Sequence, residues 1–426
     1  MDETVGTSQG SGRRRRRPVL TVVAAAAAAG ITAASVPAAY GSVAGAGRQH
    51  RPHAQAGARR GPTAYVATST RAVVAINLKT STVLKTIRLK VHGLPQDMAV
   101  APNGRTVYVL SAPLPTPAAP VPSGGAVTPI STATGRAGRP IRLRGDLQQI
   151  LITPDSRTAY VLDAGTGLVP INLSTRRPLP EIKVRNAGGE AMMPSGKTIY
   201  MAANHGIVPV DLSTGTALKP IAFPKSTMLG LGPVISPNGA TLYENFTGPA
   251  PHHRYFTSGL LGVNTAANTA LKPIRVKNFA GLQLAYAAGG ATLYWAGFNS
   301  VLAVDTATNK PLKRIFLPGT SDSYIITSSP DASAVYAADQ NATASKSWVV
   351  RINAATNTAG APISLGPAGW APWIMAVAPD GSVYVGSNRS GPNGGPGMVT
   401  VIRPGSARVS KRIRLNGAPR EIVFAP

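Results

Sequence analysis

A short phrase returns along the chain: an apolar stretch, a proline, a turn and a strand-like segment centred on a tyrosine. One copy reads APNGRTVYVL at residues 101–110, and another reads SPNGATLYEN at residues 236–245. The proline restricts φ, Asn or Asp bonds back to the backbone, and glycine accepts a positive φ. This chemistry predicts a tight hairpin between two short strands. A repeated hairpin constrains the fold more than any other feature of the sequence.

Tyrosines mark the period of this repeat, and they lie about 46 residues apart, the length of a four-stranded propeller blade. Each unit contains a strand ending at proline (A), the tyrosine strand (B), a strand ending in Asn or Asp (C) and an IRL-like strand (D). The sequence therefore predicts an all-β propeller of four-stranded antiparallel blades. We expect eight blades, or seven if the weak unit around Ala288 is irregular. The tyrosines are Tyr65, Tyr108, Tyr160, Tyr200, Tyr243, Tyr294, Tyr336 and Tyr384.

The two ends of the repeat region predict how the ring closes. The first B strand, around Tyr65, has no A strand before it, and the chain finishes on an A strand, APREIVFAP, with no B strand after it. We therefore expect residues 419–426 to form the inner strand of the blade whose other three strands lie in residues 63–90. Such closure leaves no open sheet edge, and open edges favour aggregation.

The repeats resemble the YVTN family of β-propeller repeats, a type found in secreted bacterial proteins and named for a Tyr-Val-Thr-Asn signature. The corresponding segments here read YVAT, YVLS, YVLD, YMAA and YVGS. The segment AVDTATNKPLKRI at residues 303–315 resembles a second element of that family. The resemblance covers residues 61–426 and implies one propeller domain. Many such propellers have seven blades, whereas eight units are found here.

The N-terminus has the pattern of a targeting segment. Five arginines precede a weakly apolar, alanine-rich run that ends in small residues, at residues 13–40. This order is typical of an export signal, so we predict that residues 1–46 direct export, with cleavage after Ala38 or Ala46. The alternative is an uncleaved membrane anchor over residues 19–40. Residues 47–60 are predicted to be a disordered linker, and the protein is expected to be secreted or extracytoplasmic.

The chain is strongly basic, with a formal net charge of +27 although charged residues make up only 14% of it. This charge indicates either attraction to polyanions such as nucleic acid or wall polymers, or only a solvated basic surface. No aromatic-flanked basic stripe is present in the sequence. The absence of cysteine excludes disulfides and thiolate metal sites.

Loop variation predicts which side of the propeller carries function. The A–B and C–D turns are short and alike, whereas the B–C and D–A connections vary, and these two kinds of connection lie on one face. Variable loops on a rigid scaffold are typical of binding sites. On that face, polar residues at the start of the A strands should ring the mouth of the central channel. The predicted ligand-binding residues are Gln96, Asp97, Gln148, Gln149, Glu190, Gln283, Tyr324, Trp373, Arg420 and Glu421.

The sequence gives weaker signals for catalysis or metal binding than for ligand binding. His205, His252 and His253 are weak metal candidates in neighbouring blades, but no metal-ligand spacing is present. No catalytic residues and no cofactor are predicted. We expect a scaffold that binds a protein, a wall polymer or a small ligand. The alternatives are a propeller enzyme of the lactonase or lyase type and a polyanion-binding protein. A membrane would be a partner only through an uncleaved N-terminal segment.

Overall fold

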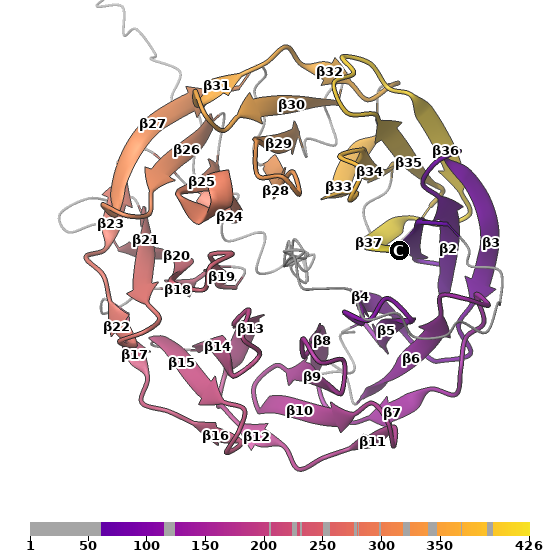
Figure 1. Cartoon of the computed structure of the whole chain (residues 1–426), viewed down its shortest axis with the longest axis horizontal. Coiled ribbons are helices and arrows are strands. Elements are labelled where there is room, and N and C mark those ends of the chain that lie inside the picture. The colour runs from indigo at the N-terminus through magenta and orange to yellow at the C-terminus, as the bar shows by residue number, and fades with distance from the viewer. Residues whose placement is uncertain are drawn as a thin grey trace, which may run out of the picture. The chain divides into compact units, whose positions relative to one another are not determined.

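The computed structural model describes residues 61–426 except 115–123, 204–205, 224–227, 231, 250–255, 277–278, 280, 298–299, 318–323, 340–346, 368 and 390–394. The described residues form eight antiparallel sheets, the blades of a propeller (Figure 1). The prediction of eight blades is confirmed, and the alternative of seven is wrong. The predicted export signal and linker lie outside the described residues.

Blades 1 to 4 are formed as follows. Blade 1 contains β1 (Thr63–Thr68), β2 (Ala72–Asn77), β3 (Thr82–Arg88) and β37 (Pro419–Ala425). Blade 2 contains β4 (Leu94–Val100), β5 (Thr106–Ala112), β6 (Gly125–Ser131) and β7 (Ile141–Leu143). Blade 3 contains β8 (Leu147–Ile152), β9 (Thr158–Asp163), β10 (Gly167–Asn172), β11 (Arg177–Pro178) and β12 (Ile182–Lys183). Blade 4 contains β13 (Ala187–Met192), β14 (Thr198–Ala203), β15 (Gly206–Asp211), β16 (Thr216–Ala217) and β17 (Ile221–Ala222).

Blades 5 to 8 repeat the pattern. Blade 5 contains β18 (Met228–Leu229), β19 (Val234–Ile235), β20 (Thr241–Pro249), β21 (Phe256–Asn264), β22 (Thr269–Ala270) and β23 (Ile274–Val276). Blade 6 contains β24 (Gly281–Ala287), β25 (Thr292–Gly297), β26 (Ser300–Asp305) and β27 (Lys310–Phe316). Blade 7 contains β28 (Tyr324–Ser328), β29 (Ala334–Asp339), β30 (Trp348–Asn353), β31 (Thr358–Ala359) and β32 (Ile363–Ser364). Blade 8 contains β33 (Ala371–Val377), β34 (Val383–Asn388), β35 (Gly397–Ile402) and β36 (Lys411–Leu415).

The ring closes through its two ends, as predicted. Strand β37 pairs antiparallel with β1, and Val423 lies opposite Tyr65. The backbone N–H of Ser69 also donates to the carbonyl of Ala418 at 2.9 Å. The last strand of the chain is therefore the inner strand of the first blade.

Prolines accompany most of the breaks in the outer strands. In blade 3 the outer strand is split into β11 and β12, with Pro180 two residues before the isoleucine Ile182. In blades 4, 5 and 7 a proline (Pro220, Pro273 and Pro362) directly precedes the isoleucine of the D strand, and there the strand is split into two short pieces. Proline has no N–H to donate to a ladder. Blades 1 and 6 have Thr86 and Arg314 at this position, and their outer strands β3 and β27 run unbroken for 7 residues.

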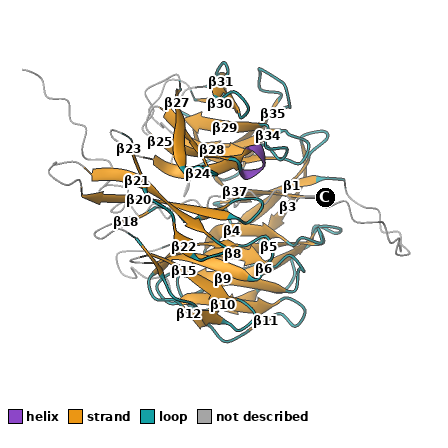
Figure 2. Ribbon diagram, turned by 60° about the vertical axis from the view of Figure 1, so that its left-hand side comes forward, coloured by secondary structure: helices purple, strands orange, loops and turns teal. Residues whose placement is uncertain are grey.

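The core lies between the blades. Tyr65 is 1% exposed and packs with Met98 and Val107 of blade 2, and Tyr384 of blade 8 packs with Val66 of blade 1. Both surfaces of each sheet are covered, which explains the continuous apolar runs in the sequence. The weak unit keeps its place in blade 6, where the 3₁₀ turn η1 (Ala288–Gly290) replaces the usual A–B turn. Figure 2 shows this turn among strands and loops.

Candidate functional site

Among the described residues, a β-bulge recurs near the start of the inner strand in six blades. In β4, for example, Pro95 lies opposite Ser111 and Asp97 opposite Leu110, so Gln96 is the extra residue. Bulges redirect side chains and are frequent near functional sites. Four residues of the predicted channel-mouth site are therefore bulge residues. The extra residues are Gln96, Gln148, Gly188, Leu282, Trp373 and Arg420.

The predicted residues next to the bulge bind neighbouring blades to one another. The Asp97 Oδ2 accepts a hydrogen bond from the backbone N–H of Ile150 at 2.8 Å. The Gln149 Oε1 accepts one from the N–H of Glu190 at 3.4 Å, and the Gln283 Oε1 accepts one from the N–H of Ile326 at 3.1 Å. Because each bond reaches the inner strand of the next blade, these side chains hold the inner strands together.

A charged side chain, Arg420 of blade 1, makes the corresponding contact with the inner strand of blade 2. The Arg420 Nε donates to the carbonyl of Pro95 at 2.6 Å, and its Nη2 donates to the Gln96 Oε1 at 3.0 Å. Burial lowers the pKa of Arg420.

Two further predicted residues bond within their own blades. The Glu421 Oε1 accepts from the N–H of Ile422 at 3.1 Å. Gln148 donates to the Asp146 Oδ1 at 2.8 Å.

The aromatic candidates are Trp373 and Tyr324. Trp373 is half-buried, and its indole N–H has no hydrogen-bond partner among the described residues. Tyr324 begins β28 opposite Asp339. The Arg389 guanidinium lies 5.3 Å from the ring centroid of the neighbouring Trp370, so a cation already covers one face of that ring.

The metal candidates His205, His252 and His253 lie outside the described residues. Within the described part of the chain, no three His, Cys, Asp or Glu side chains could hold a metal ion together.

Two acids are buried in blades 4 and 5. Both carboxyl oxygens of Glu190 lack a hydrogen-bond partner among the described residues, and burial, with the charge of Asp97, raises its pKa well above the usual value. Burial also raises the pKa of Glu244 to about 8, although the backbone N–H groups of Gly232 and Gly230 oppose this shift. A Cβ added to Gly232 would lie 3.4 Å from the Cα of Gly189, so this segment of blade 5 packs beside Glu190.

Sequence reasoning missed two cavities between blades. We call the first pocket 8/1, a cavity of about 410 Å³ between blades 8 and 1. The Thr70 hydroxyl donates to the carbonyl of Asn416 at 2.8 Å and joins its two walls. The lining contains two guanidinium groups and no carboxylate. The lining residues are Thr68, Thr70, Arg71, Ala72, Val74, Thr86, Arg88, Leu89 and Asn416.

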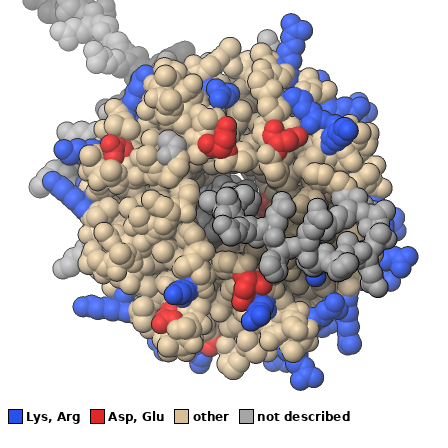
Figure 3. All heavy atoms as spheres, viewed as in Figure 1, with Lys and Arg blue, Asp and Glu red and all other residues tan. Residues whose placement is uncertain are grey.

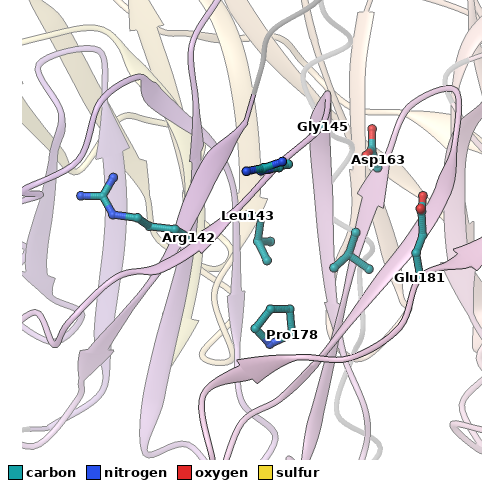
Figure 4. Close-up of a pocket in the computed structure, with 8 residues that line it drawn as sticks. Arg142, Leu143, Gly145, Asp163, Pro178 and Glu181 are labelled. Atoms are coloured by element: carbon teal, nitrogen blue, oxygen red, sulfur yellow. The ribbon is translucent and has the colours of Figure 1, made fainter.

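We call the second cavity pocket 2/3, which has about 550 Å³ between blades 2 and 3. The buried Asp163 accepts the N–H of Asp146 through its Oδ1 at 2.8 Å. Figure 4 shows the carboxylates of Asp163 and Glu181 pointing the same way, while the Arg142 side chain points away from them. The lining residues are Arg142, Leu143, Arg144, Gly145, Asp163, Val169, Pro178 and Glu181.

The two pockets occupy equivalent places in the repeat. Thr68 and Asp163 both end a B strand, three residues after the tyrosine, and Asn416 and Arg144 both follow the D-strand leucine and precede a glycine. Both linings therefore include residues of the B–C or D–A connections, and we call the face of these connections the loop face. The opposite face, with the A–B and C–D turns, is the turn face. The sequence signal was the pair of phrases LNG and LRG, at residues 415–417 and 143–145.

Comparison with known proteins supports the class defined by this fold, a β-propeller protein. No family model and no curated protein matches the sequence. The chain is similar to the dihydro-heme d1 dehydrogenase NirN in complex with DHE, with a TM-score of 0.63, 15% identity and coverage of 88% of this chain and 77% of that chain.

Two further solved structures are similar to the chain. AztD from Citrobacter koseri, in its apo form, has a TM-score of 0.58 and 15% identity, over 85% of this chain and 98% of that chain. Hydrazine synthase from Kuenenia stuttgartiensis has a TM-score of 0.54 and 17% identity, over 74% of this chain and 97% of that chain. These similarities show the propeller fold. In the described part of the chain, no helix is long and apolar enough to span a bilayer.

Proposed function

We propose that the protein is a scaffold that binds a protein, wall polymer or small ligand on its loop face. The observation that carries this proposal is that pocket 8/1 and pocket 2/3 are both lined in part by residues of the connections on that face. Several of the predicted channel-mouth side chains hydrogen-bond to neighbouring blades, so these side chains serve the joints between blades. The channel-mouth residues remain candidates for a second contact area.

The proposal includes the location and the family. The basic and alanine-rich segment of residues 1–46 supports export, and residues 61–426 act as one propeller of the YVTN repeat type outside the cytoplasm. N-terminal sequencing of protein recovered from the producing cells tests this part. A mature N-terminus after Ala38 or Ala46 is the expected result. An intact N-terminus in a membrane fraction would instead establish the anchor.

The absence of cysteine allows a direct test of the loop face. Asn416→Cys places a unique thiol in pocket 8/1, and Lys197→Cys places one on the turn face; both positions are exposed. Each variant is labelled with a bulky polyethylene glycol maleimide and mixed with isolated cell envelopes. Labelling at position 416 should abolish binding, and labelling at position 197 should leave it intact. Equal effects from both labels would refute binding through the loop face.

An enzyme is the second candidate, and the buried acids favour it. Glu190 and Glu244 have raised pKa values, which a general acid requires at neutral pH. The test is a screen of lactones and acidic glycans for hydrolysis or elimination. Activity that is lost in Glu190→Gln, with the unfolding midpoint unchanged, would establish the enzyme. No turnover by the wild-type protein would leave the scaffold as the function.

A further inference from the structure

A row of basic residues follows the outer rim of four consecutive blades. In every blade except blade 5, the end of the D strand has one exposed residue between two buried apolar ones, as in Ile87-Arg88-Leu89. The strand pairing places these exposed residues in register from blade to blade, because Arg88 lies opposite Ala72 and Arg142 opposite Ala126. We call the row the basic arc. Its members, in blades 8, 1, 2 and 3, are Arg414, Arg88, Arg142 and Lys183.

The remaining blades do not continue the arc evenly. The equivalent residues of blades 4, 6 and 7 are Ala222, Phe316 and Ser364. In blade 5 the Arg275 guanidinium lies 5.3 Å from the ring centroid of Phe246. The continuous run of cations therefore covers one half of the ring. Basic side chains also occur elsewhere around the rim (Figure 3), so the regular register distinguishes the arc from the general charge of the protein.

Pocket 8/1 lies beside the basic arc, and it brings the arc residue Arg88 together with a second arginine, Arg71. Arg88 and Arg71 line the pocket, and no carboxylate does. Among the described residues the only ion pair joins Arg403 to Asp380, so neither pocket arginine is neutralised by a described acid. Guanidinium groups recognise phosphate and carboxylate through paired hydrogen bonds. The pocket is therefore suited to one anionic group, with further cations at equivalent positions in the adjoining blades.

We infer that the basic arc binds an extended acidic polymer whose charges are phosphodiesters, of the wall-polymer type, and that pocket 8/1 holds one of its phosphates. This inference rests on the proposed function and names the partner class of the loop face. One cation per blade matches a chain that runs along the rim and contacts several blades in turn. The D strands of the arc carry no aromatic side chain, and single-stranded nucleic acid requires such stacking platforms.

The experiment measures binding of poly(glycerol phosphate) to the full chain at several salt concentrations. The arc variant combines Arg88→Gln, Arg142→Gln and Arg414→Gln. The matched control combines Arg105→Gln, Arg157→Gln and Lys197→Gln, which removes three exposed cations from equivalent A–B turns on the turn face. All six side chains are exposed, so both variants should fold like the wild type.

The wild-type protein should bind the polymer, with an affinity that falls as salt rises. Each lost phosphate contact should lower the slope of log affinity against log salt by about 0.7 to 0.9, so the arc variant should lose about 2 units of slope. The control should keep the wild-type slope. An equal loss in both variants would show that only the overall charge matters and would overturn the inference.

A second arm compares polymers of different chemistry. Single-stranded DNA of the same charge should bind more weakly than poly(glycerol phosphate). Tighter binding of the DNA, or no binding of poly(glycerol phosphate) at low salt, would overturn the inference. The proposed function fails separately: if labelling at position 416 abolishes envelope binding while the polymer is ignored, the scaffold remains and only the polymer is wrong.

Discussion

Pocket 8/1 and pocket 2/3 have the same place in the repeat and different chemistry. In pocket 8/1 the cations Arg71 and Arg88 come from blade 1, and the loop of blade 8 contributes the neutral Asn416. In pocket 2/3 the cations Arg142 and Arg144 come from blade 2 and the loop after it, and blade 3 contributes the acids Asp163 and Glu181. The backbone of the repeat therefore builds the pocket, and a few side chains determine whether its cations are balanced by acids.

The difference also shows how each pocket is held together. Pocket 2/3 is closed by a charged bond, because Asp163 accepts the N–H of Asp146. Pocket 8/1 is closed by neutral hydroxyls, since Thr68 donates to the carbonyl of Ala72 at 3.0 Å and Thr70 donates to that of Asn416. The walls of pocket 2/3 therefore depend on the carboxylate of Asp163 for their hydrogen bond. The walls of pocket 8/1 are joined by hydroxyl groups, so that pocket needs no acid.

The largest expected effect is the loss of stability when alanine replaces the D–A loop glycine of each pocket, Gly145 or Gly417. Gly145 has φ +104°, and an added Cβ would collide with the carboxylate of Asp163. Gly145→Ala should therefore cost about 3 kcal/mol, from backbone strain and loss of the charged bond. Gly417→Ala in pocket 8/1, where the Cβ would meet the Thr70 side chain at 2.8 Å, should cost about 2 kcal/mol. Urea unfolding measures both, and a larger cost at Gly417 would reverse the comparison.

Removing the hydrogen bonds made by Asp163 in pocket 2/3 and by Thr68 in pocket 8/1 should have the next largest effect on stability. Asp163→Ala leaves the partly buried N–H of Asp146 without its acceptor and should destabilise the fold by about 2 kcal/mol. Thr68→Ala removes a neutral hydrogen bond and should cost about 1 kcal/mol. The two variants are compared by the midpoint of chemical unfolding. Equal costs would mean that the charge of Asp163 contributes nothing to the closure.

Charge exchange should change binding rather than folding. Asn416→Arg gives pocket 8/1 the cation found in pocket 2/3, and Glu181→Thr gives pocket 2/3 the neutral residue found in pocket 8/1. One unit charge near the ligand contributes about 1 kcal/mol in water, so each change should strengthen poly(glycerol phosphate) binding about fivefold at low salt. Titration with the labelled polymer measures the change. Weaker binding by Asn416→Arg would show that pocket 8/1 does not receive a phosphate.

The smallest expected effect depends on pH. Burial, opposed by the bond from Gln148 and assisted by Asp163, raises the pKa of Asp146. A raised pKa favours the protonated form of the folded state, so the carboxyl destabilises the fold once the pH exceeds its unfolded pKa of about 3.9. Asp146→Asn should therefore gain stability over the wild type as the pH rises, and the gain should level off above the folded pKa.

Melting temperatures from pH 3 to pH 7 measure this gain, which stays small because the side chain of Asp146 is partly exposed. The matched control is Thr86→Val in pocket 8/1, which removes no titratable group. Its stability difference from the wild type should not change with pH. A gain by Asp146→Asn at pH 3 that equals the gain at pH 7 would contradict the raised pKa.

Much of the fold followed from local chemistry, and less of the site did. The proline turns and tyrosines predicted eight blades, with seven as the alternative. The unmatched ends predicted that residues 419–426 join the first blade, where Val423 lies opposite Tyr65. The columns of polar residues on the inner strands were also predicted, because residues in register share a position. The hydrogen bonds that these residues make were not predicted. Asp97 accepts the N–H of Ile150 in the next blade, and no spacing within one blade reveals such a contact.

The sequence by itself determined a closed ring of repeated four-stranded blades, because each turn and strand pair is encoded within a few neighbouring residues. The structure decided for eight blades over seven. Only the tertiary structure decided where open pockets remain, since their walls come from different blades. Thr70 and Asn416, which join across pocket 8/1, are 346 positions apart in the chain. Packing between blades determines whether two such residues enclose a cavity or fill it, and the chemistry within one repeat does not.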